Sequence, residues 1–340
     1  MMVAICSFQV RRSIHAGLPA MVSFAGYPGT AMPLDPLAKR FLVMMAAAAP
    51  AERTRPSAGE RRQSLARLMQ FARAEADVTT RDGTLPGPGG EIAYRLYAPE
   101  KAGESVAGFV FFHGGGMVAG SIETHDRVAA ALAEATGCRL ISIDYRLAPE
   151  HKFPAAVDDA IAATQYIARN APLFGIDATR LVVGGDSAGA TLAAVVCQHA
   201  QRHAAIAISA QLLICPVLDF EETSPSREAF AEHHVIDRAT LQADLADYLP
   251  EDADPADPRI SPLRALNLKG LPTAIIHTAE FDPMRDEGNA YARRLLAAGN
   301  AVEHTCHDGM IHNFYAMGAL LPQAQMILSQ IGEQVRRAVR

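Results

Sequence analysis

The 340-residue chain predicts an α/β protein with a mostly parallel, doubly wound sheet, and three observations lead to this fold class. Continuous apolar runs recur after residue 105, as is typical of strands buried on both faces of a parallel sheet. Helical segments separate these runs, and this alternation favours helices on both faces of the sheet. Hydrophobic residues make up 49% of the chain, which is enough for a large core.

The first periodic pattern, between residues 32 and 76, predicts two helices. The stretch "MPLDPLAKRFLVMM" contains Asp35 and Pro36, which suit an N-cap and the first helical position. The stretch "AGERRQSLARLMQFARAEA" places Leu65 and Leu68 with other apolar residues at helical spacing. Two strand candidates follow, "ADVTTRD" and "EIAYRLYAP", and the turn-rich "GTLPGPGG" separates them.

The apolar runs that follow predict the buried strands, at residues 106–113, 139–145, 180–186, 210–219 and 273–282. Helical segments accompany them: "HDRVAAALAEATG", "PAAVDDAIAATQYIARNA", "AGATLAAVVCQHA" and "RDEGNAYARRLLAAG". The later stretch "AVEHTCHD" alternates like an edge strand. Residues 220–250 break this rhythm, because they are charged and helix-prone but show no obvious core face.

Composition and charge exclude several function classes. The formal net charge is −6 and no long basic run occurs, so nucleic-acid binding, which needs clustered Lys and Arg, is not expected. No apolar stretch approaches the roughly 20 residues of a membrane span. Near the N-terminus, Arg11 and Arg12 follow the apolar stretch instead of preceding it, which is the opposite of a secretory signal.

The five cysteines form no CxxC pair, and their odd number does not suit a disulfide framework. They are Cys6, Cys138, Cys197, Cys215 and Cys306. We therefore expect reduced, mostly buried thiols and a cytoplasmic protein. The adjacent His233 and His234 invite a metal site, but neighbouring residues of a helix point about 100° apart and no HExxH pattern occurs, so no metal is expected.

The stretch "VVGGDSAGA", residues 182–190, places Ser187 between glycines directly after a β-branched run. It fits the G-x-S-x-G pattern of a nucleophile at a sharp strand-to-helix turn. Gly185 and Gly189 are expected there because a Cβ at either position would collide with neighbouring backbone. Asp186 is expected to support this turn, the nucleophile elbow, through hydrogen bonds. The alternative interpretation is a glycine-containing turn with a helix-capping serine.

A second glycine-rich stretch, "FFHGGGMVAG", strengthens the catalytic interpretation. It puts His113 and three glycines directly after a buried strand, where a merely flexible loop is not expected. Bare backbone N–H groups can approach a developing oxyanion, and an HGGG loop, with the N–H that follows the nucleophile, forms the oxyanion hole of lipases and esterases. We predict that Gly115, Gly116 and Ala188 supply these N–H groups and that His113 supports the site.

Ser187 needs a general base, because a serine hydroxyl is inert at neutral pH without one. In this architecture the order along the chain is serine, then acid, then histidine. His304 and His307 lie within the alternating "AVEHTCHD", where we expect them to pack or to face solvent. His312 lies beyond the C-terminal end of that strand, where ligand-facing residues belong in an open α/β sheet, so we predict that His312 is the base.

For the acid, the stretch "AEFDPMRDEG" offers Glu280, Asp282 and Asp286. Asp282 lies at the end of the strand that precedes His312 by one helical crossover. Right-handed crossovers place successive parallel strands side by side, so these two strand ends can meet. The pair Asp282-Pro283 also suits an N-cap followed by a first helical proline, and both roles are compatible. We expect Glu280 and Asp286 to be structural.

At these motifs the sequence resembles the hormone-sensitive-lipase-like branch of the α/β-hydrolase fold, especially its bacterial esterases. The resemblance runs from about Met32 to the C-terminus. It rests on six blocks in the family's order: "HGGGMVAGSIETHD", "DYRLAPEHKFPAAVDDA", "GGDSAGATLAA", "DPRISPLRA", "EFDPMRDEG" and "DGMIHNFY". It implies a nucleophile at Ser187, an acid at Asp282 and a base at His312, the same residues that their positions in the chain indicate.

The resemblance also implies a helical cap over the active site, formed by residues 32–76 and by an insertion at 220–250. The hydrolase core would then comprise residues 77–219 and 251–340. Family members often begin near a sequence like "MPLDP", so we expect residues 1–31 to be an upstream extension.

The sequence thus predicts a serine carboxylesterase that hydrolyses short- to medium-chain acyl esters through an acyl-enzyme intermediate. We expect no cofactor and a small-molecule ester as the partner, and the sequence allows a homodimer through an edge strand or the last helix. Alternatives are a long-chain lipase, an amidase or peptidase with the same triad, or a ligand receptor without chemistry. The lack of Trp and of a long apolar lid segment weighs against the lipase, and the presence of all three reactive residues weighs against the receptor.

Overall fold

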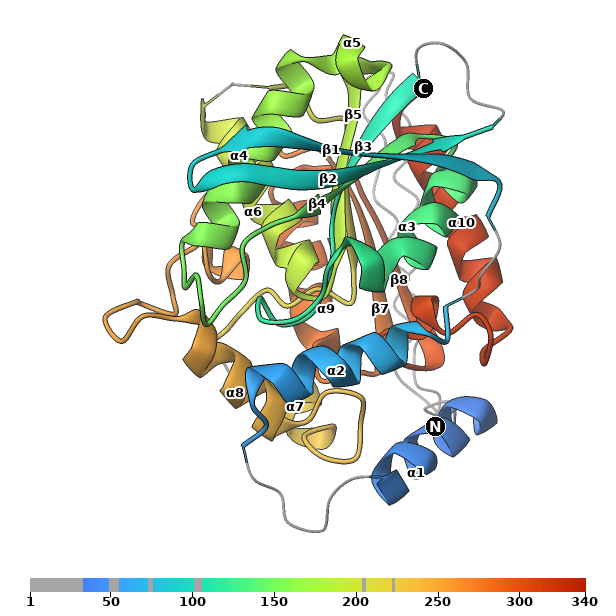
Figure 1. The fold of residues 1–340 in the computed structure, drawn as a ribbon. Helices are drawn as coiled ribbons and strands as arrows, with labels where there is room; N and C mark the ends of the chain where they lie inside the picture. Colours follow the sequence, from blue (N-terminus) through green and yellow to red (C-terminus); the bar gives the residue numbers. More distant parts are fainter. Residues whose placement is uncertain (1–32, 49–54, 73–75, 101–105, 204–205, 222–223) are drawn as a thin grey trace, which may run out of the picture.

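The computed structural model describes residues 33–48, 55–72, 76–100, 106–203, 206–221 and 224–340. In this part of the chain an eight-stranded sheet lies between two layers of helices, and further helices lie across one end of the strands (Figure 1). The predicted fold class is confirmed, because the sheet is mostly parallel and has helices on both faces.

The order of strands in the sheet is β1-β2-β4-β3-β5-β6-β7-β8. The strands are β1 (Val78–Gly87), β2 (Gly90–Pro99), β3 (Val106–Phe112), β4 (Arg139–Asp144), β5 (Ile176–Asp186), β6 (Ala210–Ile214), β7 (Thr273–Phe281) and β8 (Val302–Ile311). β1 pairs antiparallel with β2, and β2 pairs antiparallel with β4. The other neighbours pair in parallel, so the carboxyl ends of β3 to β8 meet at one edge of the sheet.

Two layers of helices bury the two faces of this sheet. The helices are α1 (Pro36–Ala48), α2 (Ala58–Met69), α3 (Ile122–Thr136), α4 (Ala155–Arg169), α5 (Ala171–Phe174), α6 (Ala188–His203), α7 (Pro225–Ala229), α8 (Arg238–Tyr248), α9 (Arg285–Ala297) and α10 (Gln323–Ala338). Val183 of β5 packs in a cluster with α4, α6 and α9, whereas Val182 packs with α3 and α10. Because neighbouring strand residues point to opposite faces, both must be apolar, which explains the continuous apolar runs.

Several strands differ from their predicted lengths. β5 begins at Ile176 instead of residue 180, and β8 continues to Ile311, beyond the predicted stretch "AVEHTCHD". The stretch "GTLPGPGG" is mostly strand instead of turn, because β1 and β2 pair all the way to Gly87 and Gly90. A two-residue loop and a positive φ of 128° at Gly90 suffice to reverse the chain. β6 ends at Ile214, short of the predicted end at residue 219, because Cys215 has a φ of 46° and Pro216 has no N–H to donate.

Helices α1, α2, α7 and α8 lie near the carboxyl ends of the strands (Figure 1). α1 begins as the sequence predicts, because the Asp35 carboxylate accepts a hydrogen bond of 2.8 Å from the N–H of Leu37. α2 begins at a capping box formed by Ser57 and Glu60. The division of the chain into cap and core stays a prediction, and the expected upstream extension lies outside the described residues.

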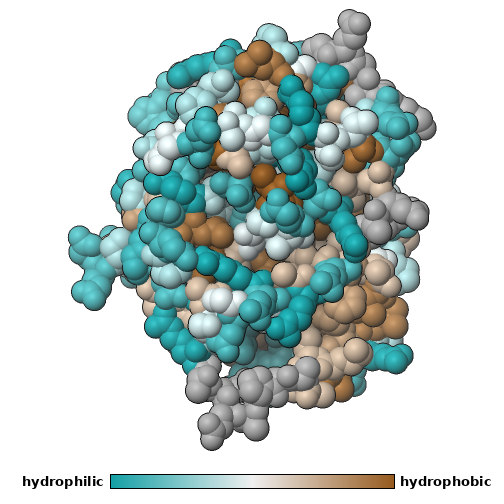
Figure 2. All heavy atoms as spheres, in the orientation of Figure 1, coloured by the Kyte–Doolittle hydropathy of each residue, from teal (hydrophilic) through white to brown (hydrophobic). Residues whose placement is uncertain are grey.

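One side of α1 exposes apolar side chains. Val43 and Met44 are 61% and 58% exposed, and Figure 2 shows a hydrophobic patch over this helix at the lower right of the molecule. Throughout the described ranges, no helix combines the length and the apolar character needed to cross a membrane. Four of the five cysteines lie in described segments, and all four are free thiols.

Candidate active site

Ser187 lies at the turn between β5 and α6 with a φ of 51°, a conformation that side chains rarely adopt. Its N–H donates a hydrogen bond of 2.8 Å to the carbonyl of Ile214 on the neighbouring strand. A Cβ at Gly185 or at Gly189 would collide with the backbone carbonyl of Phe112. The glycines therefore permit a turn so sharp that the Ser187 side chain reaches the pocket above the sheet, at the positive end of α6.

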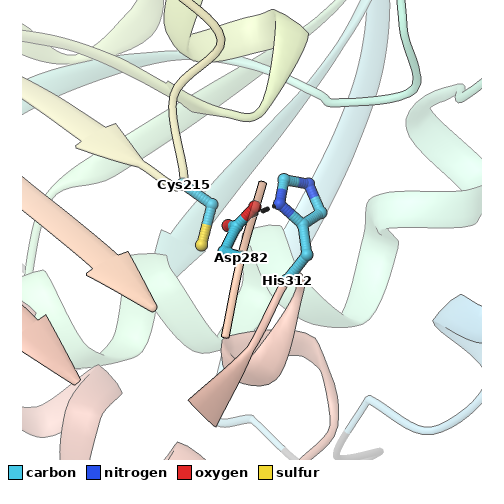
Figure 3. A group of neighbouring side chains, drawn as sticks. All are labelled: Cys215, Asp282 and His312. Carbon is cyan, nitrogen blue, oxygen red and sulfur yellow. Dashed lines mark hydrogen bonds and ion pairs between the residues drawn. The ribbon is translucent and has the colours of Figure 1, made fainter. Parts of the chain in front are cut away.

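Asp282 and His312 meet at the ends of two neighbouring strands. Phe281 and Ile311 are the last paired residues of β7 and β8, so the next residue of each strand lies beside the other. The Nδ1–H of His312 donates a hydrogen bond of 2.7 Å to Oδ2 of Asp282 (Figure 3). The other oxygen of Asp282 accepts one of 2.8 Å from the N–H of Met284, so the carboxylate is held from both sides.

The second imidazole nitrogen of His312 is available for a proton. Nε2 is buried and has no hydrogen-bond partner among the described residues. Because Nδ1 carries its hydrogen toward Asp282, Nε2 presents a lone pair. His312 and Ser187 line the same pocket, which has a volume of about 200 Å³. An alcohol and a proton acceptor that line one pocket, with a carboxylate that orients the acceptor, can perform nucleophilic catalysis.

The glycine loop after β3 lines the same pocket. Gly115 and Gly116 have φ angles of 123° and 64°, and both line the pocket together with Ala188. A Cβ at Gly115 would collide with the carbonyl of Ala119, so this position cannot accept a side chain. The Nδ1–H of His113 donates a hydrogen bond of 2.9 Å to the carbonyl of Gly114, which fixes the loop from below. The backbone of this loop is therefore preorganised.

Asp186 joins the serine turn to the glycine loop. Its carboxylate accepts hydrogen bonds of 3.0 Å from the N–H of Gly114 and of 2.5 Å from the hydroxyl of Tyr315, and His125 Nε2 lies 3.6 Å away. Burial raises the pKa of Asp186, but His125 and the Tyr315 hydrogen bond outweigh this effect and hold the pKa below its usual value. Asp186 is thus a charged acceptor at the centre of a network. The sequence does not predict that Tyr315 and His125 contact Asp186. The position of Tyr315 near His312 is the one indication that it lies close to the site.

The rival candidates for base and acid are engaged elsewhere. His304 Nε2 contacts the hydroxyl of Thr278 at 3.1 Å, and His307 Nε2 contacts Nδ1 of His277 at 2.8 Å. Burial lowers the pKa of both His304 and His307 to about 4. Glu280 and Asp286 accept hydrogen bonds from backbone N–H groups, those of Gly309 and Ser226 respectively. These four residues have packing and structural contacts, as the sequence predicts.

One trio in the described residues has the spacing of a metal site, namely Cys215, Asp282 and His312. Figure 3 shows Asp282 between the other two side chains. Burial raises the pKa of the Cys215 thiol well above its usual value, and the Asp282 carboxylate raises it further. A metal needs the thiolate, and it would have to displace the hydrogen bond between Asp282 and His312. The trio therefore does not fit a metal ion.

Helices α2 and α8 close the pocket from above, and this wall contains an ion-pair group that the sequence analysis missed. Arg61 of α2 hydrogen-bonds to both Asp244 and Asp247 of α8. Burial raises the pKa of Asp244 to about 7, although Arg61 lowers it. Arg61 and Asp244 line the pocket, whereas Asp247 does not. The sequence does not indicate that these residues meet. They lie on two helices far apart in the chain, and charged residues on a helix are typical of a solvent-exposed face.

Comparisons with known proteins show which family this chain belongs to. A family model for the alpha/beta hydrolase fold matches residues 109–316. The carboxylic ester hydrolase LipN of Mycobacterium tuberculosis is 41% identical over 258 residues, which cover 74% of this chain and 68% of the relative. The ethyl acetate hydrolase of Pseudomonas putida is 37% identical over 269 residues, which cover 78% of this chain and 82% of the relative.

A solved structure is similar over most of the chain. The ester hydrolase EH1AB1 from the metagenome of Lake Arreo, complexed with a derivative of bipyridine phosphonate, superposes with a TM-score of 0.85 at 39% identity. The match covers 89% of this chain and 98% of that one. Sequence, sheet topology and these relatives agree, and we conclude that the chain belongs to the α/β-hydrolase fold family, in its hormone-sensitive-lipase-like branch of bacterial esterases.

Proposed function

We propose that this chain is a serine carboxylesterase that acts on small-molecule esters with short to medium acyl chains. One observation carries the proposal: the hydrogen bond of 2.7 Å from His312 to Asp282 leaves the other imidazole nitrogen buried, without a partner in the described part of the chain, in the pocket that Ser187 also lines. Relatives named carboxylic ester hydrolase and ethyl acetate hydrolase support it, since both names specify ester hydrolysis.

In the proposed mechanism, Ser187 Oγ attacks the carbonyl carbon of the ester while Nε2 of His312 takes the hydroxyl proton. Asp282 keeps the imidazole in the tautomer that can accept this proton and stabilises the imidazolium that forms. The carbonyl oxygen becomes an oxyanion, and the N–H groups of Gly115, Gly116 and Ala188 stabilise it. One such donor contributes about 3–4 kcal/mol to lowering the barrier in enzymes of this type.

The intermediate then collapses. The C–O bond to the alcohol breaks, His312 gives its proton to the leaving alkoxide oxygen, and the acyl group stays on Ser187 as an ester. Water repeats the same steps and releases the carboxylic acid. Gly185 and Gly189 serve by permitting the sharp turn, and Asp186 and His113 serve by supporting it and the glycine loop. The mechanism requires no cofactor.

Pocket size supports small substrates. A volume of about 200 Å³ lies below the range of roughly 300–1,000 Å³ that holds drug-sized ligands. A second candidate, a lipase for long acyl chains, has one observation in its favour. Met45 lines the pocket and is the neighbour of the exposed Val43 and Met44, so an apolar surface adjoins the pocket wall. The test therefore includes esters with acyl chains of different lengths.

Two further predictions accompany the proposal. We place the protein in the cytoplasm, which the free thiols of the described cysteines support, because disulfides are rare in reducing compartments. A homodimer stays a prediction, with the edge strand β8 and the last helix α10 as the surfaces to test.

The experiment combines covalent labelling with a series of nitrophenyl esters. We expect a fluorophosphonate to label the wild type once, at Ser187, and not to label Ser187→Ala, whereas the control Ser209→Ala keeps both labelling and turnover. We expect kcat/KM to be highest for acetate to butyrate esters. If the wild type were not labelled, the proposal of an activated serine would be refuted. If kcat/KM were highest for the palmitate ester, the protein would be a lipase for long acyl chains and not a carboxylesterase.

A further inference from the structure

Apart from the proposed catalytic residues and their chain neighbours Asp186 and Asn313, the pocket has one polar corner in a largely apolar wall. Arg61 and Ser64 of α2 and Thr240 and Asp244 of α8 line it. Residues three or four apart share one face of a helix, so each of these pairs presents its side chains from one face to the pocket. Apolar residues of the same helices, such as Leu65, line the rest of the wall. The polar corner is therefore a local feature and not the general character of the pocket.

Asp244 lies directly against the glycine loop. A Cβ at Gly116 would collide with Oδ2 of Asp244, so this oxygen packs against the Cα atom of Gly116. The absence of a side chain at residue 116 thus makes room for the carboxylate. Because the N–H of Gly116 is a proposed donor to the oxyanion, a substrate bound in this pocket carries its carbonyl group close to Asp244.

The two carboxylate oxygens of Asp244 differ in their partners within the described residues: Oδ1 accepts a hydrogen bond from Arg61, and Oδ2 accepts none. Arg61 donates through one Nη to Oδ1 of Asp244 and through the other to Asp247. No described residue donates to Oδ2 of Asp244, and the Asp244 side chain is only 15% exposed. A methyl group bound against this oxygen would remove its remaining water and give nothing in return, whereas an O–H or N–H group would supply the missing hydrogen bond.

We propose that Asp244 is a specificity-determining residue that selects esters carrying a hydrogen-bond donor, a hydroxyl or an amino group, within a few atoms of the ester carbonyl. The proposal rests on the proposed esterase function and names the substrate class of the same site. It also explains the position of Arg61. The arginine stabilises a carboxylate next to the oxyanion hole, where an uncompensated negative charge would oppose the developing oxyanion.

The test uses pairs of esters that differ only by a hydroxyl in place of a methyl group. For the alcohol side the pair is 2-hydroxyethyl butyrate and propyl butyrate, and for the acyl side it is ethyl 3-hydroxybutyrate and ethyl 3-methylbutyrate. Acid release in a pH-stat gives kcat/KM for each ester, with the pH held above the Asp244 pKa of about 7 so that the carboxylate is charged. In the wild type we expect the hydroxyl ester to be favoured roughly 10- to 100-fold in at least one pair, as for one hydrogen bond to a charged group. The pair that shows it identifies the side of the ester that meets Asp244.

Two variants and one control test the residue itself. Asp244→Asn keeps the size and an acceptor oxygen but loses the charge, and we expect the preference to fall severalfold. Asp244→Leu removes the acceptor, and we expect the preference to disappear or to reverse. The matched control is Asp247→Asn, because Asp247 pairs with the same arginine from the same helix without lining the pocket, and it should keep the wild-type ratio.

The outcomes separate the two proposals. Ratios near one in both pairs for the wild type, or an unchanged ratio in both Asp244 variants, would overturn the role of Asp244 while the esterase function stands. A wild type that hydrolyses none of the four esters, nor nitrophenyl butyrate, would overturn the esterase function itself. An equal loss of preference in Asp247→Asn would assign the effect to the ion pair between the helices and would refute a direct contact of Asp244 with substrate.

Discussion

At the residue scale, the proposed role of Asp282 as the acid depends on a single carboxylate oxygen. Its Oδ2 accepts the Nδ1–H of His312 at 2.7 Å, so the proton-accepting lone pair stays on Nε2. In Asp282→Asn, the amide can donate to Nδ1 and favours the tautomer with the hydrogen on Nε2, which cannot accept a proton from Ser187. We expect kcat for nitrophenyl butyrate to fall roughly 10⁴-fold, the size of the equivalent change in a serine protease, with little change in melting temperature.

The control for this variant is Glu280→Gln. Glu280 accepts the N–H of Gly309 at 2.8 Å, so its replacement should affect stability slightly and leave turnover close to that of the wild type. Near-normal turnover in Asp282→Asn, together with a large loss in Glu280→Gln, would move the acid to Glu280.

The sequence predicts the candidate site residues because the constraints on their positions are local. A glycine beside a serine turn, or a residue at a strand end, needs no knowledge of distant partners.

At the scale of elements, Arg61 holds α2 to α8 through Asp244 and Asp247. Its side chain is 6% exposed, so this is a largely buried group of charges. Arg61→Met would leave both carboxylates without that partner, and breaking a buried pair costs about 3–5 kcal/mol. We expect backbone amides of α2 and α8 to exchange hydrogen markedly faster in this variant, whereas amides of the central strands keep their protection. Hydrogen–deuterium exchange with mass spectrometry measures both.

The matched control is Arg238→Met in α8. Arg238 pairs with Glu228, but both side chains are more than half exposed, and such pairs contribute only about 0–1 kcal/mol. Its exchange pattern should equal that of the wild type. Faster exchange throughout the sheet in Arg61→Met would contradict the idea that this contact stabilises only the wall above the pocket.

At the scale of the whole molecule, buried histidines make stability depend on pH. His307 donates to or accepts from His277 at 2.8 Å, and Gln334 of α10 binds the other nitrogen of His277, so this group joins β7, β8 and α10. Burial lowers the pKa of His307 to about 4, and neighbouring His304 lowers it further. A histidine with a lowered pKa in the folded state contributes stability that is fully present above its unfolded pKa of about 6.5 and is lost as pH falls toward 4.

The prediction compares the pH dependence of stability in the wild type with that in His307→Gln. A comparison is needed because the raised pKa of Asp244 makes the folded state more stable as pH falls, which opposes the effect of His307. His307→Gln keeps a hydrogen-bonding side chain but removes this titration. As pH falls from 6.5 to 4, we expect the free energy of unfolding of the wild type to decrease by about 3 kcal/mol more than that of the variant. Urea denaturation at a series of pH values measures it. Parallel curves for the two proteins would show that His307 does not titrate on unfolding.

The sequence by itself determined the alternation of strands and helices, the serine turn, the glycine loop, and the selection of Asp282 and His312 from their neighbours. These features follow from short-range constraints: neighbouring residues of a strand face opposite layers, a sharp turn excludes a Cβ, and parallel strands end at one edge. The lengths of β1 and β6 were less predictable, because pairing partners decide where a strand ends.

Only the tertiary structure decided what surrounds these residues. Arg61 and Asp244 are 183 positions apart, and Tyr315 and Asp186 are 129 positions apart, yet each pair is in hydrogen-bond contact. From the sequence of one helix, a charged side chain is expected to face solvent. It becomes a pocket residue only when another helix packs over it. The character of the polar corner therefore depends on how the helices pack above the sheet, which no local pattern in the chain specifies.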